Sequence, residues 1–114
     1  MFIFNGKNYQ CPFDCFSEIT KGKWRSAIIV LLKNEPLRFS ELRRSLDGVS
    51  SKVLTDNLKL LEQCGIVSRR VFDTIPPAVE YSLSEQGAEL AELMDGINRW
   101  THRFAGEKFL SAAK

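Results

Sequence analysis

Two apolar stripes at helical spacing occupy the first third of the chain. The first predicts a helix from Cys11-Pro12 to about Thr20, because proline, which lacks an N–H, suits the first helical position. The second stripe is broader and predicts a helix from about Lys23 to Lys33, which we expect at the centre of the core. The stripes consist of Phe13, Phe16 and Ile19, then Trp24, Ala27, Ile28, Leu31 and Leu32.

The next segment predicts a short helix followed by a tight turn. Ser40 can N-cap this helix, which covers roughly Glu41 to Leu46, and Asp47-Gly48 supplies the turn. Any surface helix carries polar residues on its outer face. The prediction that the next, longer helix contacts DNA therefore depends on this short helix and tight turn, because such a pair precedes the recognition helix in helix-turn-helix proteins.

The longer helix that follows runs from Ser50 or Ser51 to Cys64-Gly65, where glycine suits a left-handed cap. Its inward positions are Val49, either Val53 or Leu54, Leu58 and Leu61. A helix in a DNA major groove contacts bases with its first turns, and its N-terminal N–H groups also suit a phosphate. The candidates for DNA contact are Ser50, Ser51, Lys52, Thr55, Asp56 and Lys59.

Strand-like alternation follows this helix. Ile66 to Asp73 alternates as one strand, Val79, Tyr81 and Leu83 form the apolar face of its partner, and Thr74 to Pro77 make a stiff tip. Together with the preceding helices, this pattern predicts a winged helix-turn-helix, which is a mainly α fold with a small β-hairpin (α+β). We assign a single domain to residues 1–114, with the helix-turn-helix at about 38–64 and the wing at about 66–83.

A long helix is predicted from its cap at Ser84 to about Phe104, roughly 30 Å at about 1.5 Å per residue. Its apolar seam exceeds what one small core can cover, and Met1-Phe2-Ile3-Phe4 and Phe109 add further apolar surface. We therefore predict that the last helix and the N-terminal segment form a homodimer surface, with dimerisation helices at about 11–20 and 84–108. The dimer would read a near-palindrome with half-sites about 34 Å apart. The alternative is a monomer whose last helix folds back on its own core. The predicted interface residues are Phe13, Phe16, Leu90, Leu93, Met94, Ile97, Trp100 and Phe104.

Charge changes this picture through its distribution. The net charge is only +2, but Lys and Arg exceed Asp and Glu by six between Lys21 and Arg70, whereas the acidic residues prevail from Val71 onward. The basic half coincides with the helix-turn-helix and the first wing strand, as expected for contact with phosphates. Arg69 or Arg70 is expected either to pair with Glu80 across the hairpin or to reach the DNA backbone. The basic candidates for DNA contact outside the longer helix are Lys23, Arg38, Arg43, Arg69 and Arg70.

Several functional classes find no support in the residues. There is no run of roughly 20 apolar residues for a membrane span and no secretory leader, so we expect a cytoplasmic protein with reduced cysteines. His102 is the single histidine and has no nucleophile or carboxylate pair near it in sequence, so no enzyme is predicted. No cofactor or metal is expected either, because Cys11, Cys15, Cys64 and His102 match no zinc-ligand spacing.

A set of motifs recurs in order along the chain: Cys11-Pro12, Gly22-Lys23-Trp24, residues 37–43, Val49-Ser50, Leu54-Thr55, Leu58 with Leu61-Glu62, Gly65-Ile66-Val67, Pro76-Pro77 and residues 79–83. These motifs resemble those of the HxlR-type bacterial transcription regulators, which are relatives of the MarR group. The resemblance covers about residues 11–104 and implies a homodimeric winged-helix protein that binds double-stranded DNA and represses or activates genes, often those next to its own. It also implies dimerisation through the first and last helices.

The chain departs from the family pattern at the wing and on the longer helix. Ala78 stands where a basic residue is common, and Leu60 stands where a polar residue is usual on an exposed helix face. Asp56 would repel phosphate, although a carboxylate can accept a hydrogen bond from cytosine N4. Two further functional classes stay open: a winged-helix module that binds another protein, and a regulator gated by a small ligand held near Trp24, Phe16 or Trp100.

Cys11 is the candidate for regulation by oxidants or electrophiles. A thiol at a helix N-terminus has its thiolate favoured by the helix dipole, although Asp14 works against this. The resemblance matches Cys11 to a cysteine that senses oxidants in several family members. The alternative is a small buried residue that happens to cap the helix. Cys15, one turn further along the same helix, is either a resolving thiol or part of the core, and Cys64 is expected to be structural.

Overall fold

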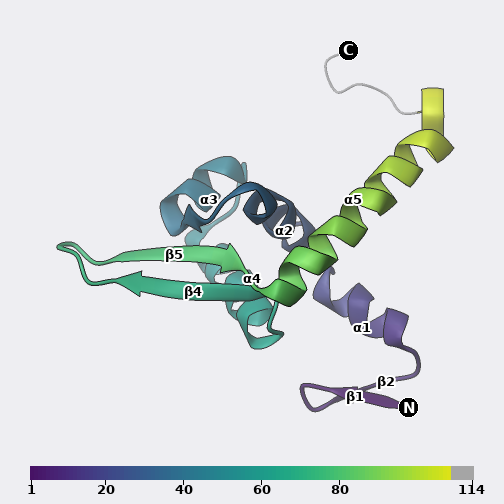
Figure 1. The fold of residues 1–114 in the computed structure, drawn as a ribbon, viewed down its shortest axis with the longest axis horizontal. Helices are drawn as coiled ribbons and strands as arrows, with labels where there is room; N and C mark the ends of the chain where they lie inside the picture. The colour runs from purple at the N-terminus through teal and green to yellow at the C-terminus, as the bar shows by residue number, and fades with distance from the viewer. Residues whose placement is uncertain (109–114) are drawn as a thin grey trace.

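The computed structural model describes residues 1–108. Figure 1 shows a helical body, with the wing hairpin extending on the left and the last helix rising on the right. The elements are β1 (Phe2–Phe4), β2 (Lys7–Tyr9), α1 (Pro12–Ile19), α2 (Arg25–Asn34), β3 (Leu37–Arg38), α3 (Phe39–Ser45), α4 (Ser51–Gln63), β4 (Val67–Phe72), β5 (Ala78–Leu83), α5 (Glu85–Ala105) and a 3₁₀ turn at Gly106–Lys108.

The predicted helices are confirmed, and α2 and α4 form the centre of the core. Ile28 and Ile29 of α2 are fully buried. On α4, Leu54, Leu58 and Leu61 each expose at most 1% of their surface. Burying each such side chain contributes about 1.5–3 kcal/mol, so this contact holds the domain together. Of the two inward candidates, Leu54 is the buried one, since Val53 is 39% exposed.

The start of α3 differs from the prediction. Ser40 was expected to N-cap a helix beginning at Glu41, and this is wrong: the helix begins at Phe39, with Arg38 at the N-cap position. The backbone N–H of Arg38 donates to the Glu41 carboxylate at 2.8 Å, which satisfies one unpaired donor of the first turn. The helix starts earlier because Leu37 and Arg38 are held extended in a strand, so the chain must turn directly after them.

The wing is a three-stranded antiparallel sheet in the order β3-β5-β4. The predicted hairpin of β4 and β5 is confirmed, with Val67 opposite Leu83 and Val71 opposite Val79. The two-residue strand β3 was not predicted; it adds Leu37 beside Tyr81 on the other edge of β5. The sheet thereby joins the helix-turn-helix to the wing through backbone hydrogen bonds.

Helices α1 and α5 project from this body. The side chain of Ser84 caps α5 by accepting from the Gly87 N–H at 3.0 Å, and Lys33 of α2 pairs with Asp95 and with Glu92 (3.3 Å) on α5. Only the first half of α5 packs on the core. The radius of gyration is 15.8 Å, whereas a compact domain of this length has about 13 Å. The chain therefore presents two arms beyond its own core (Figure 1).

The N-terminal segment, which was expected to add apolar surface to the dimer interface, folds into the hairpin β1–β2, a structure that was not predicted. Asn5 and Gly6 both have positive φ, the backbone of a tight hairpin turn. The hairpin covers the end of α4: a cavity of about 160 Å³ between them is lined by Phe4, Tyr9 and Leu60, among others. This cover explains the apolar residue at position 60. Phe109 lies outside the described residues.

Gly87 in the first turn of α5 provides a test of this packing. A Cβ there would lie 2.1 Å from the Ile66 carbonyl oxygen, a backbone atom that cannot move independently. We expect Gly87→Ala to lower the free energy of unfolding by about 1–3 kcal/mol. Gly96→Ala in the same helix is the matched control, because the added methyl meets only the end of Arg99.

Chemical denaturation of both variants measures the difference. The control should gain about 0.5–1 kcal/mol from better helix propensity. Equal stability of the two variants would show that α5 does not press against the start of the wing as described.

Candidate nucleic-acid interface

The outward face of α4 is polar and exposed along its whole length. Ser51, Lys52, Thr55, Asp56 and Lys59 are all exposed, as predicted from their spacing. The Lys52 ammonium pairs with the Asp56 carboxylate at 2.9 Å, four residues apart on the helix. This pair offsets the repulsion that Asp56 alone would exert on a phosphate, although each exposed pair of this kind contributes little stability.

The N-terminus of α4 is fixed by Ser50. Its hydroxyl oxygen accepts from the Val53 N–H at 3.1 Å, so Ser50 is the N-cap residue and Ser51 the first helical residue. Ser50 itself is exposed. Asn57, which lies on the same helix, is half-buried and its amide is engaged within the protein.

The basic side chains of the wing differ in their surroundings. Arg69 and Arg70 are both exposed on β4, and Arg70 stands opposite Glu80 in the register. Within the described residues its guanidinium lies over the ring of Phe72, 4.5 Å from the centroid, and forms no ion pair with Glu80. Among residues 1–108 neither Arg69 nor Arg70 forms an ion pair with Glu80, so the first of the two alternatives is not observed. The second, a contact with the DNA backbone, stays a prediction.

A groove of about 630 Å³ separates the start of α3 from the wing tip. Arg38 and Ala78, the position where the wing itself lacks a basic residue, both line this groove. Arg43 lines a shallower hollow with Phe39, Ser40 and Arg44. Arg44 was not among the predicted residues, although its place directly after Arg43 in a helix of the motif could have indicated it.

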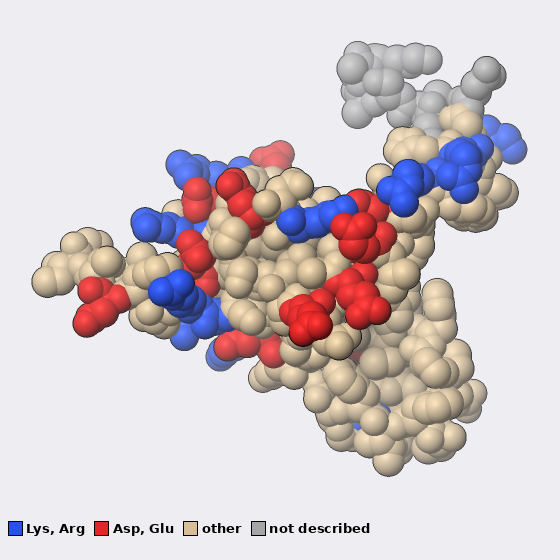
Figure 2. All heavy atoms as spheres, viewed as in Figure 1, with Lys and Arg blue, Asp and Glu red and all other residues tan. Residues whose placement is uncertain are grey.

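Lys23 lies apart from these residues, in the turn before α2. Its ammonium sits 4.8 Å from the centroid of the Trp24 ring. Figure 2 shows how charge is distributed: Lys and Arg gather around α3 and the stem of the wing, interspersed with acidic residues, while Asp and Glu lie along the first half of α5. The helix-turn-helix side thus carries most of the cations in this view.

The arms carry an apolar face. Phe13 of α1 and Leu93, Ile97, Trp100 and Phe104 of α5 are each at least half exposed. The rings of Trp100 and Phe104 stack on each other at 4.9 Å. Leu90, Met94 and Phe16 are half-buried, and the first two pack against the core. All eight residues predicted for an interface thus lie on the two projecting helices.

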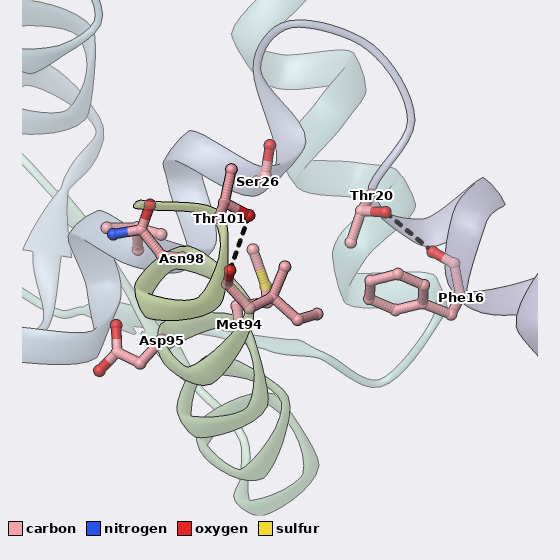
Figure 3. A pocket seen from close by; sticks show the side chains of 9 residues that line it. Phe16, Thr20, Ser26, Met94, Asp95, Asn98 and Thr101 are labelled. Carbon is pink, nitrogen blue, oxygen red and sulfur yellow. Dashed lines mark hydrogen bonds between the residues drawn. The ribbon is translucent and has the colours of Figure 1, made fainter. Parts of the chain in front are cut away.

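A pocket of about 470 Å³ opens between α1, α2 and α5 beside this apolar face. Figure 3 shows Phe16, Met94, Asn98 and Thr101 around it. The hydroxyls of Thr20 and Thr101 donate to carbonyl oxygens of their own helices, at 3.0 and 2.8 Å. Three ring side chains were expected near a ligand: Phe16, Trp24 and Trp100. Among the described residues that line this pocket, only Phe16 is one of these three.

The three cysteines are free thiols in different settings. Cys11 is exposed at the N-cap position of α1, directly after the hairpin, while Cys15 and Cys64 are half-buried. Burial raises the pKa of the Cys64 thiol, and the nearby Cys15 raises it further. Cys64 therefore carries less thiolate than an ordinary cysteine and is less reactive.

Within residues 1–108 no group of three or more His, Cys, Asp or Glu side chains is placed to hold a metal ion. In the same range, no helix has the length and apolar character needed to cross a membrane.

Comparison with known proteins identifies the family of the chain. The model of the HxlR-like helix-turn-helix family matches residues 19–109. The chain belongs to this family. A relative, the uncharacterized HTH-type transcriptional regulator YkvN of Bacillus subtilis, is 34% identical over 103 residues, which cover 90% of this chain and 87% of YkvN.

Solved structures agree with the HxlR-like assignment. A transcriptional regulator of the MarR family from Enterococcus faecalis V583 superposes with a TM-score of 0.81 at 32% identity, covering 92% of this chain and 96% of that one. The redox regulator HypR in its reduced form superposes with a TM-score of 0.78 at 32% identity, covering 87% and 100%. The predicted winged helix-turn-helix fold is confirmed, and the chain is a DNA-binding transcriptional regulator rather than an enzyme.

Proposed function

We propose that this regulator acts as a homodimer on a near-palindromic operator, with one α4 helix in each of two successive major grooves. The observation that carries this proposal is the pairing of two exposed faces on one small domain. The outward face of α4 is polar from its first turn, and the arms α1 and α5 carry an apolar face larger than the core can cover. Apolar surface of this extent favours a partner, and two-fold pairing is the commonest arrangement.

In this proposal the contacts divide by chemistry. Ser51, Lys52, Thr55 and Lys59 face base edges, because they occupy the exposed side of the recognition helix. The cations around it, which are Arg38, Arg43, Arg69 and Arg70, face phosphates and set the register. Arg38 takes the place of a basic wing residue, since it lines the same groove as Ala78.

We further propose that Cys11 makes the regulator responsive to oxidants. Cys11 is exposed and sits where the hairpin joins α1, one of the two proposed dimer helices. Its modification would alter the relative placement of the two protomers, and with it the spacing of the two α4 helices. HypR, which the chain resembles at 32% identity, is a redox regulator solved in both reduced and oxidised forms.

A ligand-gated regulator is the second candidate. The pocket between α1, α2 and α5 favours it, because about 470 Å³ lies within the size range of small-molecule sites and its wall combines apolar and polar groups. The two versions separate experimentally: replacing Cys11 removes the response of a thiol sensor, but leaves the response of a ligand-gated regulator intact.

The first prediction concerns DNA binding itself. Selection from a pool of random duplexes with the purified protein should enrich a near-palindromic sequence. Binding to that duplex should weaken about a thousandfold between about 50 and 200 mM salt if some six phosphates are contacted. Fluorescence anisotropy against a scrambled duplex measures both quantities. A pool that yields no enriched sequence, or affinity that salt leaves unchanged, would contradict DNA reading and favour a protein-binding module.

The second prediction concerns the dimer. The wild-type chain should sediment at twice its mass of 13.0 kDa, and Leu93→Glu with Ile97→Glu should shift it toward the monomer, because charges would be buried in an apolar interface. Gln86→Glu is the control, since it adds a negative charge at an exposed position in the first turn of α5, outside the apolar face. A monomeric wild type would exclude the dimer proposal.

The third prediction concerns Cys11. Mild oxidation should weaken binding of the wild type to the selected duplex, and Cys11→Ser should abolish that response while keeping the reduced affinity. Cys64→Ser serves as the control, because Cys64 is half-buried with a raised pKa and should leave the response intact. If the Cys11→Ser protein still loses DNA on oxidation, the sensor is another residue.

A further inference from the structure

Arg25 joins three helices through one half-buried guanidinium. It is the first residue of α2, and its Nη1 donates to the Glu18 carbonyl oxygen in the last turn of α1 at 2.6 Å. Its Nε donates to the Asn57 side-chain oxygen on α4 at 3.1 Å. Neither bond is part of the DNA-facing surface described above, so their role must be sought in the placement of the helices.

Both contacts are well suited to fix a geometry. The Glu18 carbonyl lies in the last turn of α1, where it also accepts from the Lys21 N–H at 3.4 Å, and a positive charge there meets the negative end of the helix dipole. The Asn57 amide is itself held, because its Nδ2 donates to the Val53 carbonyl at 2.8 Å, which turns its oxygen toward Arg25. Because the guanidinium is planar and donates to two acceptors, it restricts the relative orientation of the helices more than one hydrogen bond would.

A second connection between the same helices runs through the N-terminal hairpin. The Lys7 ammonium pairs with the Glu18 carboxylate at 3.1 Å, and the Asn5 amide donates to the Gln63 carbonyl at the end of α4. The pKa of the Glu18 carboxyl is lowered by the hydrogen bond from Lys7 and by its charge. Glu18 thus links α1 to α4 twice: its carbonyl through Arg25 to Asn57, its carboxylate through the hairpin to Gln63.

We propose that Arg25 is a positioning residue for DNA reading. It fixes the orientation of α4 relative to α1 through Asn57, so that the sequence preference depends on a side chain that does not touch DNA. The inference rests on the proposed function, because it concerns the preference with which α4 reads an operator. Asn57 lies on the same helix as Thr55 and Lys59, and a small rotation of α4 about its axis would displace the ends of both.

A double-mutant cycle in DNA affinity tests this role. Arg25→Met should lower the preference for the selected duplex over the scrambled one about tenfold, the equivalent of one charge-assisted hydrogen bond. Asn57→Ala should do the same, and the double variant should lose no more than either single variant, because both remove one contact. Affinity for the scrambled duplex and the salt dependence should stay at the wild-type values. Lys21→Met is the control, since it removes an exposed cation from the adjoining turn.

Each other outcome overturns the inference. A uniform loss on both duplexes with a smaller salt slope would make Arg25 a phosphate contact instead. Additive losses, an unchanged preference, or an equal loss in Lys21→Met would each remove the link through Asn57. Circular dichroism verifies that the variants fold. If Arg25→Met does not fold, the DNA preference of Asn57→Ala alone decides whether the contact between these two residues positions α4. Absence of any preference in the wild type would overturn the proposed function as well, which distinguishes the two failures.

Discussion

The packing of one leucine face of α4 against α2 is the constraint on which the rest of this domain depends. Leu54, Leu58 and Leu61 are spaced so that all three turn inward, and their burial decides which face of the helix meets the core. The opposite face, with Lys52, Thr55 and Lys59, must then point to solvent. Recognition chemistry on the outside is therefore a geometric consequence of hydrophobic burial on the inside.

The parts of the fold that could be predicted from the sequence are those whose signal is periodic and local. The helices and the main wing hairpin repeat apolar residues over several turns or several pairs, so their existence and faces follow from spacing. The strand β3 has only two residues and exists because β5 offers it a partner far along the chain. The start of α3 was misplaced for the same reason. The Asn5-Gly6 turn was a readable hairpin signal, but its strands have only three residues each.

The candidate site divides in the same way. The outward residues of α4 and the wing arginines followed from periodicity, whereas the contacts of Arg25 and Arg38 depend on elements that meet only in the folded chain. The departures from the family pattern also find local explanations. Leu60 is covered by the hairpin, and Asp56 is paired with Lys52. Each of these two departures, Leu60 and Asp56, is thus accommodated by a contact that forms in the folded chain.

The uneven distribution of charge over the domain has a consequence for the encounter with DNA. Lys and Arg gather around α3 and the wing stem, among acidic residues, and again on the outer half of α5, whereas the first half of α5 carries a row of acidic side chains (Figure 2). The net charge of only +2 therefore conceals surfaces of opposite sign. A polyanion attracts the surfaces where cations prevail and repels the acidic row before any contact forms, which raises the fraction of productive collisions. The acidic row thus disfavours approaches in which the wrong side of the protein would meet the double helix.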